Sequence, residues 1–416
     1  MITAPRGVHD ILPEQSSRWR WLEEQFVEVC RLYGFQEIRL PYFESTELFQ
    51  RGVGEATDIV RKEMYTFDDR SQRSLTLRPE ITAGIVRALI EHKLYAEAMP
   101  LKLFTYGALF RYERPQSGRY RQFHQFDIEI FGTASPLADA EIIAVGMDLF
   151  HRIGLADIEV QLNSIGCAVC RPVHRQAILE YLSQRLNKLC ADCQSRYQLN
   201  PLRVFDCKNE ACQAEFTELP LMKDYLCDDC REHLSLVKTY LEDLGIGYVM
   251  NDRLVRGLDY YNRTVFEYYD PQTREIGALG GGGRYDPLVA ELGGPQVPGA
   301  GYGLGIERIL ISLEQRELPQ PKLDIYIAAL GEDAQRQAVK MLHGLRGSGI
   351  SGEMDLQHRG LKAQMRQADR LKADYVAILG EEELAKGIVT LRNMTSKEQI
   401  ELSWNDLQPW LKSQLT

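Results

Sequence analysis

Apolar residues recur at two different spacings along the first part of the chain. Near the N-terminus they appear at every third or fourth position, which predicts an amphipathic helix that ends at Gly34. The next segment, residues 34–46, has the pattern of extended chain and is interrupted by Pro41. The apolar positions of the predicted helix are Trp19, Leu22, Phe26, Cys30 and Tyr33.

Two strand-like segments, residues 103–112 and 122–131, flank a polar, arginine-rich turn and are predicted to form a hairpin. Alternation in the second strand places three apolar residues on one face, and an amide and two carboxylates on the other. The polar face fits either a solvated strand or the floor of a site for a charged ligand. The turn favours the site, because guanidinium groups bind anions. The apolar positions are Phe126, Ile128 and Ile130, the polar ones are Gln125, Asp127 and Glu129, and the turn carries Arg111, Glu113, Arg114, Arg119 and Arg121.

Later segments predict an insertion and a separate C-terminal domain. Helix-like segments at 165–240 hold most of the cysteines. Strand-like sequence resumes at Ile246 and continues through 254–267 to the glycine run at 280–283, and residues 300–313 predict a glycine-rich turn that opens a helix. After a linker at 317–323, strands alternate with helices, which predicts a small mixed or parallel α/β domain. Its predicted strands include 325–330 and 375–379, and its predicted helices are 333–347 and 362–372.

The 416 residues allow two or three domains, and 44% hydrophobic with 26% charged residues is typical of a soluble globular protein. No apolar run is long enough to span a membrane, and the N-terminus lacks the pattern of a secretory signal, so we expect a cytoplasmic protein. The net charge of −10 argues against indiscriminate coating of nucleic acid. It is compatible with docking of a specific RNA through local basic patches.

The segment LVRGLDYYNRTVFE at 254–267 combines an arginine, an aspartate and two adjacent tyrosines, and GGGGRYD follows at 280–286. Such hydrogen-bonding groups suit the recognition of a small polar ligand. Neither glycine run of the chain ends like a P-loop, and the run at 280–283 alone would also fit a flexible connection. The two segments resemble the histidine signatures of the histidyl-tRNA synthetases. That resemblance covers nearly the whole chain, including PRGVHDILP at 5–13.

Two more segments resemble motifs of the class II aminoacyl-tRNA synthetases: FRYE at 110–113 is similar to motif 2, and GAGYGLGIERIL at 299–310 to motif 3. The resemblance implies that Arg111 contacts the α-phosphate of ATP, and that Arg308 clamps the γ-phosphate. Guanidinium groups suit both tasks because they bind phosphate oxygens in a bidentate way, and glycines permit close backbone approach. The implied ATP-binding residues are Arg111, Glu113 (adenine end), Arg119, Gly303, Gly305 and Arg308, and Arg114, Arg119 and Arg121 are implied to meet the tRNA.

The same resemblance implies a histidine pocket. In TLRPEITAG at 76–84, Glu80 and Thr82 share a face if the segment is extended, and with Gln125 they are implied to bind the α-ammonium. Arg256 is expected to stabilise charge that develops on the α-phosphate, although a simple ion pair with Asp259 is the alternative. A pocket that hydrogen-bonds its substrate rejects apolar isosteres, so no editing domain is expected. The implied catalytic residues are Arg256 and Arg111, and the implied histidine-binding residues are Glu80, Thr82, Gln125, Glu129 and Tyr261 (both facing the imidazole), Tyr260 and Tyr285.

Two regions are expected to contact macromolecules. Residues 39–59, with Pro41, resemble the class II motif 1 that builds a homodimer interface. The C-terminal domain resembles the anticodon-binding domain of several class II synthetases. It carries a basic row with little opposing charge, predicted to lie on one helical face. The row fits either a solvated face or contact with tRNA phosphates, and consists of Arg359, Lys362, Arg366 and Arg370.

Eight of the nine cysteines fall in short-spaced pairs, which is the spacing of zinc ligands, and two sets of four would complete two tetrahedral sites. The alternative is reduced thiols without metal, because disulfides are rare in the cytoplasm. The resemblance does not decide, since zinc is no general requirement of the family. The pairs are Cys167 and Cys170, Cys190 and Cys193, Cys207 and Cys212, and Cys227 and Cys230.

These observations predict an α+β fold: an antiparallel sheet flanked by helices in residues 1–320, a helical insertion at about 165–240, and an anticodon-binding α/β domain at 324–416. The expected activity joins histidine to tRNA(His) through histidyl-adenylate, with Mg²⁺-ATP and release of AMP and pyrophosphate. One alternative is the catalytically silent paralogue that regulates ATP phosphoribosyltransferase. A second is a class II enzyme for threonine, proline or glycine. Arg256, the paired tyrosines and the residues beyond Leu323 argue against the first alternative, and the paired tyrosines argue against the second.

Overall fold

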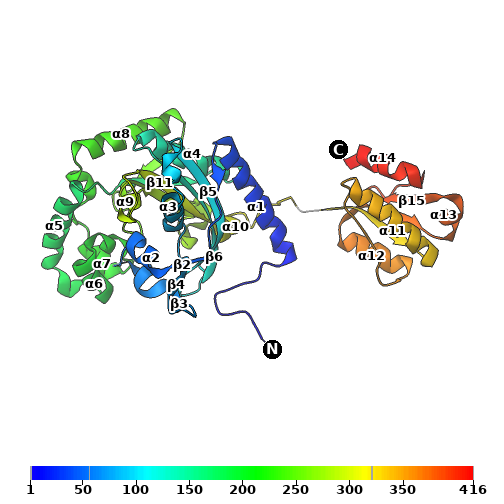
Figure 1. Ribbon diagram of the computed structural model, residues 1–416, viewed down its shortest axis with the longest axis horizontal. Coiled ribbons are helices and arrows are strands. Elements are labelled where there is room, and N and C mark those ends of the chain that lie inside the picture. The colour runs from blue at the N-terminus through cyan, green and yellow to red at the C-terminus, as the bar shows by residue number, and fades with distance from the viewer. Residues whose placement is uncertain (1, 56, 320–321, 416) are drawn as a thin grey trace. The chain divides into compact units, whose positions relative to one another are not determined.

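A largely antiparallel eight-stranded sheet lies at the centre of the first of two units, residues 1–318 and 319–416 (Figure 1). The computed structural model describes residues 2–55, 57–319 and 322–415. The antiparallel sheet flanked by helices confirms the predicted fold class. In spatial order the strands are β1 (Gln36–Glu37), β5 (Leu101–Phe110), β6 (Gln122–Phe131), β11 (Gly299–Gly305), β10 (Gly280–Arg284), β9 (Asn262–Tyr269), β7 (Glu159–Ser164) and β8 (Tyr248–Met250).

The predicted hairpin is β5 and β6, and its alternation separates core from site as expected. Phe126, Ile128 and Ile130 are buried on the face that α1 (Pro13–Leu32) and α4 (Pro136–Arg152) cover, and Phe126 stacks on Phe26 at 4.3 Å between ring centroids. Burial of each such side chain contributes about 1.5–3 kcal/mol. On the other face, α3 (Thr82–Glu91) and α9 (Leu288–Glu291) pack beside the polar side chains of β6. The remaining elements are α2 (Thr46–Val53), η1 (Ile59–Glu63), η2 (Leu94–Ala96), η6 (Pro271–Ile276), α10 (Ile306–Ser312) and the three-stranded sheet of β2 (Phe43–Ser45), β4 (Ser74–Leu77) and β3 (Tyr65–Asp68).

The helical insertion leaves the sheet after β7 and returns at β8, which pairs with β7 in parallel. Its helices form a layer along one side of the unit, green in Figure 1. Cysteines make up part of its two small cores, together with apolar side chains such as Ile178, Phe216 and Met222. Its helices are α5 (Cys170–Ser183), η3 (Leu186–Lys188), α6 (Ala191–Leu199), η4 (Pro201–Asp206), α7 (Glu210–Glu215), η5 (Met222–Tyr225) and α8 (Asp228–Asp243).

The second unit is a five-stranded mixed sheet with helices, as the alternating pattern predicted. The predicted linker at 317–323 includes residues 320 and 321, which lie outside the described residues, and its last residue already begins β12. Among all described helices, none combines the length and apolarity needed to cross a membrane. In spatial order the strands are β13 (Gly352–Met354), β12 (Leu323–Ala329), β14 (Ala373–Leu379), β15 (Ile388–Asn393) and β16 (Gln399–Ser403), and the helices are α11 (Glu332–Gly347), α12 (Leu361–Arg370), α13 (Glu381–Lys386) and α14 (Trp404–Leu415).

Three local predictions were wrong. Residues 254–261 form a loop instead of a strand, and β9 begins only at Asn262. Carbonyl groups of this loop accept hydrogen bonds from arginines of the insertion. These bonds take the place of the backbone hydrogen bonds that a neighbouring strand would make. The glycine-rich segment 299–305 is strand β11 instead of a turn. Thr82 starts α3, so Glu80 and Thr82 do not lie on one extended face.

Candidate active site

A cavity of about 330 Å³ opens on the polar face of β6. Its walls come from β6, from strands β10 and β11, from the start of α3, from the loop before β9 and from the turn after β5. Segments that are distant in sequence therefore meet in one pocket. Among the expected site residues, those that line it are Glu80, Thr82, Arg111, Glu113, Arg119, Gln125, Arg256, Tyr260, Tyr261, Gly303, Gly305 and Arg308.

One end of the pocket is cationic. Arg111 donates its Nε–H to the carbonyl of Pro79 at 2.8 Å, and Arg308 donates its own to Gly118 at 3.1 Å. Burial, together with the charges of Arg119 and Arg111, lowers the pKa of Arg308. Three guanidinium groups that repel one another, each with N–H groups still to donate, form a site for a polyanion.

The other end of the pocket is built from buried carboxyl groups and tyrosines. Glu80 accepts a hydrogen bond from the amide of Ala83 at 2.9 Å, which places its carboxyl group at the start of α3. Glu129 lies behind the pocket wall, where Thr82 Oγ1 donates to it at 2.7 Å and the Tyr285 hydroxyl donates to its other oxygen. Tyr285 and Glu129 are thus brought together, although neither lines the cavity itself.

Burial controls the charge of these acids. It raises the pKa of Glu129 to about 8, and raises the pKa of Glu80 as well. Burial, with the nearby Glu129 and Glu80, holds the pKa of Asp127 well above its usual range. Within the described residues, Asp127 Oδ2 has no hydrogen-bond partner. A buried oxygen in this position calls for a donor from a ligand, because an unpaired buried polar atom is costly.

Arg256 connects the two ends. It pairs with the Glu267 carboxylate and donates to the carbonyl of Gly281 at 3.1 Å. Burial opposes its charge, but Glu267 outweighs that effect and the pKa of Arg256 is raised. The alternative in which Arg256 pairs with Asp259 was wrong, since Asp259 accepts from Asn200 at 2.7 Å.

The glycines of β11 leave room for side chains of the neighbouring strand β6, whereas the sequence predicted that they let ATP approach the backbone. A Cβ at Gly301 would lie 1.6 Å from Glu129 Oε2, and one at Gly303 would lie 2.8 Å from Asp127 Oδ1. Gly301 and Gly303 therefore leave space on β11 for the side chains of Glu129 and Asp127, which lie on the paired strand β6. A Cβ at Gly305 would meet its nearest atom at 3.4 Å, an ordinary contact.

The arginines of the β5–β6 turn divide into three positions. Arg111 and Arg119 line the pocket, whereas Arg114 is exposed. Arg121 lies over the ring of Tyr112, 4.0 Å from its centroid, and its Nη1 is 3.5 Å from the carbonyl of Arg6. It thus holds the N-terminal segment to the turn.

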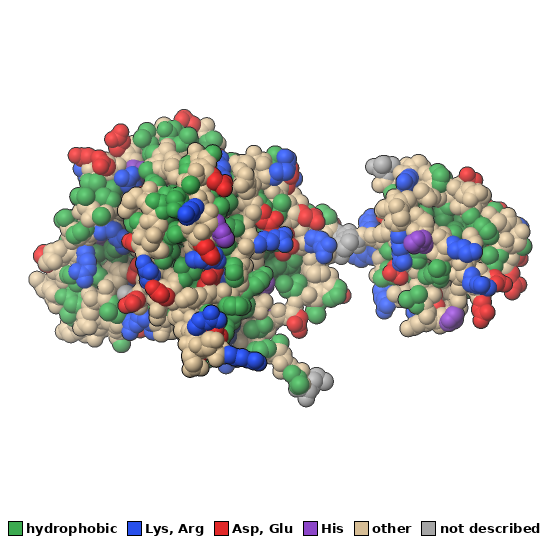
Figure 2. Space-filling model, in the orientation of Figure 1, with side chains coloured by type: hydrophobic (Ala, Val, Ile, Leu, Met, Phe, Trp, Pro, Cys, Tyr) green, Lys and Arg blue, Asp and Glu red, His purple; other side chains and the backbone are tan. Residues whose placement is uncertain are grey.

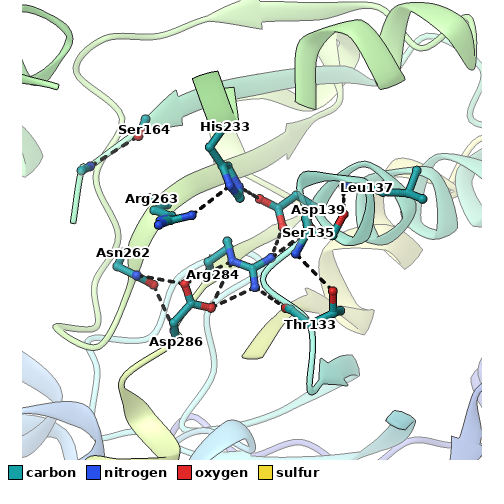
Figure 3. Close-up of polar contacts among 11 residues, drawn as sticks. Thr133, Ser135, Leu137, Asp139, Ser164, His233, Asn262, Arg263, Arg284 and Asp286 are labelled. Atoms are coloured by element: carbon teal, nitrogen blue, oxygen red, sulfur yellow. Dashed lines mark hydrogen bonds and ion pairs between the residues drawn. The ribbon is translucent and has the colours of Figure 1, made fainter. Parts of the chain in front are cut away.

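Sequence reasoning missed several residues that support the site. Asp127 was placed on the correct face by alternation but was not assigned a role, and Glu267 was not considered. Figure 3 shows a buried network behind β10: Arg284 binds Asp139 and Asp286, and Asp139 accepts from His233 of α8 at 2.7 Å. The network joins the insertion to the strand whose next residue is Tyr285. Residues so far apart leave no local sequence signal.

The eight paired cysteines form two clusters in which all sulfur atoms lie within 4.8 Å of one another. In chain order, the first and fourth pairs of cysteines form one cluster, and the second and third pairs form the other. Four thiolates at such distances are the donor set of a tetrahedral zinc site. We call Cys167, Cys170, Cys227 and Cys230 the base cluster, and Cys190, Cys193, Cys207 and Cys212 the outer cluster.

The basic row of the second unit is partly as predicted. Lys362, Arg366 and Arg370 lie exposed on α12, and no described residue forms an ion pair with them. Arg359 precedes the helix and pairs with Asp355, so its place in the row was wrong. Figure 2 shows basic and acidic side chains interspersed over the visible face of each unit.

The antiparallel sheet, with arginines from the hairpin and from the helix after β11, defines a class II aminoacyl-tRNA synthetase. A family model described as histidyl-tRNA synthetase matches residues 7–309, and one described as an anticodon binding domain matches residues 324–414. The chain belongs to the histidyl-tRNA synthetase family.

Individual relatives agree with this assignment. A histidine–tRNA ligase of Desulforamulus reducens is 51% identical over 419 residues, covering 99% of both chains. One of Moorella thermoacetica is 52% identical over 406 residues, 97% of this chain and 96% of that one. The apo histidyl-tRNA synthetase of S. aureus has a TM-score of 0.85 at 39% identity, covering 99% of this chain and 100% of that one. A Bacillus halodurans structure described as an ATP phosphoribosyltransferase regulatory subunit/histidyl-tRNA synthetase, at 22% identity and a TM-score of 0.67, shares the fold.

Proposed function

We propose that this pocket activates histidine with ATP and transfers it to tRNA(His). One observation carries the proposal: buried carboxyl groups and a cluster of arginines face the same 330 Å³ cavity. The acids suit an amino acid that arrives with a positive ammonium, and the arginines suit a triphosphate. The silent paralogue is less well supported, because Arg256 and the paired tyrosines are all in place.

The first step forms histidyl-adenylate. Glu80, Thr82 and Gln125 bind the α-ammonium, while Glu129 and Tyr261 face the imidazole. Arg111 holds the α-phosphate and Arg308 the γ-phosphate. A carboxylate oxygen of histidine attacks the α-phosphorus, the bond to the β-phosphate bridge breaks, and pyrophosphate leaves. Arg256 stabilises the negative charge that grows on the α-phosphate oxygens, because it is already oriented by Glu267.

The second step transfers the histidyl group. The terminal ribose hydroxyl of the tRNA attacks the carbonyl carbon of the adenylate, and AMP leaves. Arg114, Arg119 and Arg121 of the turn are proposed to meet the acceptor stem, and the basic row of the second unit to meet the anticodon arm. Exposure of Arg114, Lys362, Arg366 and Arg370 supports these contacts.

Two kinds of metal fit the residues present. Mg²⁺ is usually held by one or two carboxylates together with substrate phosphates. Glu267 lies beside the arginines and would supply such an oxygen, and Mg²⁺ bound there with ATP would neutralise phosphate charge. Each cysteine cluster is proposed to bind one structural zinc ion. Metal analysis of freshly purified protein should find about two zinc ions per chain, and a chain free of zinc would contradict this part of the proposal.

We also propose a homodimer that forms through residues 39–59 and works in the cytoplasm. Tyr42 and Phe43 are neighbours in this segment and each leaves 52% of its surface exposed, so together they offer an apolar contact to a second chain. Light scattering should give twice the chain mass, and Phe43→Asp should shift the protein toward the monomer.

The test of the activity is ATP–pyrophosphate exchange with each of the twenty amino acids. Exchange with histidine alone is expected. Exchange with no amino acid would favour the regulatory paralogue, and exchange with threonine, proline or glycine would favour another class II enzyme.

A further inference from the structure

The outer cysteine cluster is far from the substrate pocket in sequence, but the segment it encloses reaches the pocket wall. Between Cys193 and Cys207 the chain forms the end of α6 and then η4. Asn200 Nδ2 donates to Asp259 Oδ1 at 2.7 Å, and Arg203 Nη1 donates to the carbonyl of Gly257 at 3.1 Å. Both acceptors belong to the loop that carries Arg256 and the paired tyrosines.

This loop depends on such contacts. It precedes β9 and has no strand ladder of its own. Asp259 also fills the space beside Gly54, where a Cβ would lie 2.8 Å from its carboxylate. Arg171, next to Cys170 of the base cluster, donates to the carbonyl of Tyr261 at 3.0 Å. The insertion therefore holds the loop at three points, two of them on the segment inside the outer cluster.

Arg203 is itself firmly held. Its Nε donates to Asp206 at 2.6 Å, its side chain is 13% exposed, and Asp58 lies 3.7 Å from its Nη2. Asp206 immediately precedes Cys207. One of the contacts that hold the Arg203 guanidinium thus comes from the residue next to a cysteine of the cluster.

The core around this segment is small. Its buried members are Cys193, Cys207 and Cys212 with six apolar side chains, among them Ile178, Leu182 and Phe216. A domain of this size rarely reaches a unique fold by apolar burial alone, and a structural metal is a common remedy. Without a metal, the sulfur atoms would hold this region only by weak contacts, such as that from the Cys190 amide to Cys212 Sγ at 3.2 Å, whereas one zinc ion would join all four.

We propose that a zinc ion in the outer cluster positions the Arg256 loop through Asn200 and Arg203, so that activation of histidine depends on a metal that does not touch substrate. The inference rests on the proposed zinc sites and on the proposed activity. Asn200 and Arg203 are positioning residues. A displacement of about 1 Å at a catalytic group costs up to roughly 100-fold in rate.

The experiment combines metal content with kinetics of ATP–pyrophosphate exchange. Cys207→Ser should remove one of two zinc ions, and Arg203→Ala should keep both. Each variant should lose about 10- to 100-fold in kcat/KM for histidine. The KM for ATP should stay near the wild-type value, because the ATP arginines lie on other elements. Arg203→Lys should restore part of the loss.

The matched control is Lys188→Ala, which also removes a cation and an ion pair (with Glu215, 3.0 Å) from the insertion. It should change neither zinc content nor kinetics. The double variant of Cys207→Ser and Arg203→Ala should lose little more than either single variant, because both act through one segment.

The outcomes separate the proposals. Loss of one zinc ion with unchanged histidine kinetics would overturn the positioning role and leave the zinc sites standing. Absence of zinc from freshly purified wild-type protein would overturn the proposed zinc sites. Wild-type protein without histidine exchange would overturn the activity itself. If Cys207→Ser fails to fold, Asn200→Ala and Arg203→Ala decide alone: wild-type kinetics in both would overturn the inference.

Discussion

At one end of the pocket three arginines lie close together, whereas at the other end three carboxyl groups are buried beside tyrosines. The two ends differ in how their ionisable side chains are charged when no ligand is bound. The guanidinium groups remain charged: Arg111 and Arg308 are held by backbone carbonyls, and Arg119 by the Glu113 carboxylate. Burial favours the neutral form of the acids: it raises the pKa of Glu129 to about 8, and it raises the pKa of Glu80 and of Asp127 as well. The ligand-free pocket thus presents permanent positive charge at one end, and at the other end acids whose ionised form a cationic ligand would favour.

The largest expected effect comes from Arg256, which joins the ends. Arg256→Ala should lower kcat for histidine-dependent pyrophosphate exchange by about 100- to 1,000-fold, the usual cost of one transition-state donor. Histidine binding, measured by calorimetry, should change much less. An equal loss of binding and of kcat would mean that Arg256 serves the ground state, and the two ends would then be independent.

A second prediction tests the glycine strand beneath the carboxyl end. Gly301→Ala places a Cβ where Glu129 Oε2 now lies, so it should abolish histidine binding or expel the Glu129 side chain. Gly305→Ala is the matched change at the arginine end of the same strand, where the nearest contact is an ordinary 3.4 Å. It should leave histidine binding near the wild-type value, because it adds no atom beside Glu129. Similar losses in both variants would show that the strand, and not Glu129, is the sensitive element.

A third prediction concerns pH. Folded Glu129 has a pKa of about 8, above the value of about 4.3 in an unfolded chain. The unfolded state therefore releases a proton that the folded state keeps, and stability must fall as pH rises between these values. The free energy of unfolding of ligand-free protein should drop by about 1.4 kcal/mol per pH unit from this group.

Urea unfolding at pH 5.5 and 7.5 measures this slope. Glu129→Gln should reduce it, whereas the exposed Glu314→Gln should leave it unchanged. An unchanged slope in Glu129→Gln would show that Glu129 is ionised throughout, which would remove the difference between the two ends.

The smallest effect on the pocket is expected from the second unit. Replacing Lys362, Arg366 and Arg370 by alanine should spare pyrophosphate exchange and weaken tRNA-dependent transfer several-fold, with a shallower salt dependence because phosphate contacts are lost. Replacement of the ion-paired Arg359 should matter less. Equal losses of exchange and transfer would count against a tRNA-binding role.

Local periodicity was sufficient to predict the hairpin and the two faces of β6, because each residue of a strand alternates regardless of its partners. It failed for residues 254–261, whose strand-forming residues are held as a loop by Asn200, Arg203 and Arg171. No window of sequence contains those partners. The members of the pocket came from resemblance to a family, since Glu80, Glu129 and Arg256 lie on segments that only the folded sheet brings together.

The pairing of β6 with β11 also affects the order in which the protein can fold during synthesis. Strand β5 is available to β6 at once, but Phe131 pairs with Gly299 on the opposite edge, near the end of the first unit. Until that segment leaves the ribosome, one edge of β6 has no neighbouring strand. An unpaired strand edge is prone to association with other chains. Pairing of the glycine-rich strand β11 with β6 therefore completes the pocket. The same pairing covers the edge through which the nascent chain could associate with other chains.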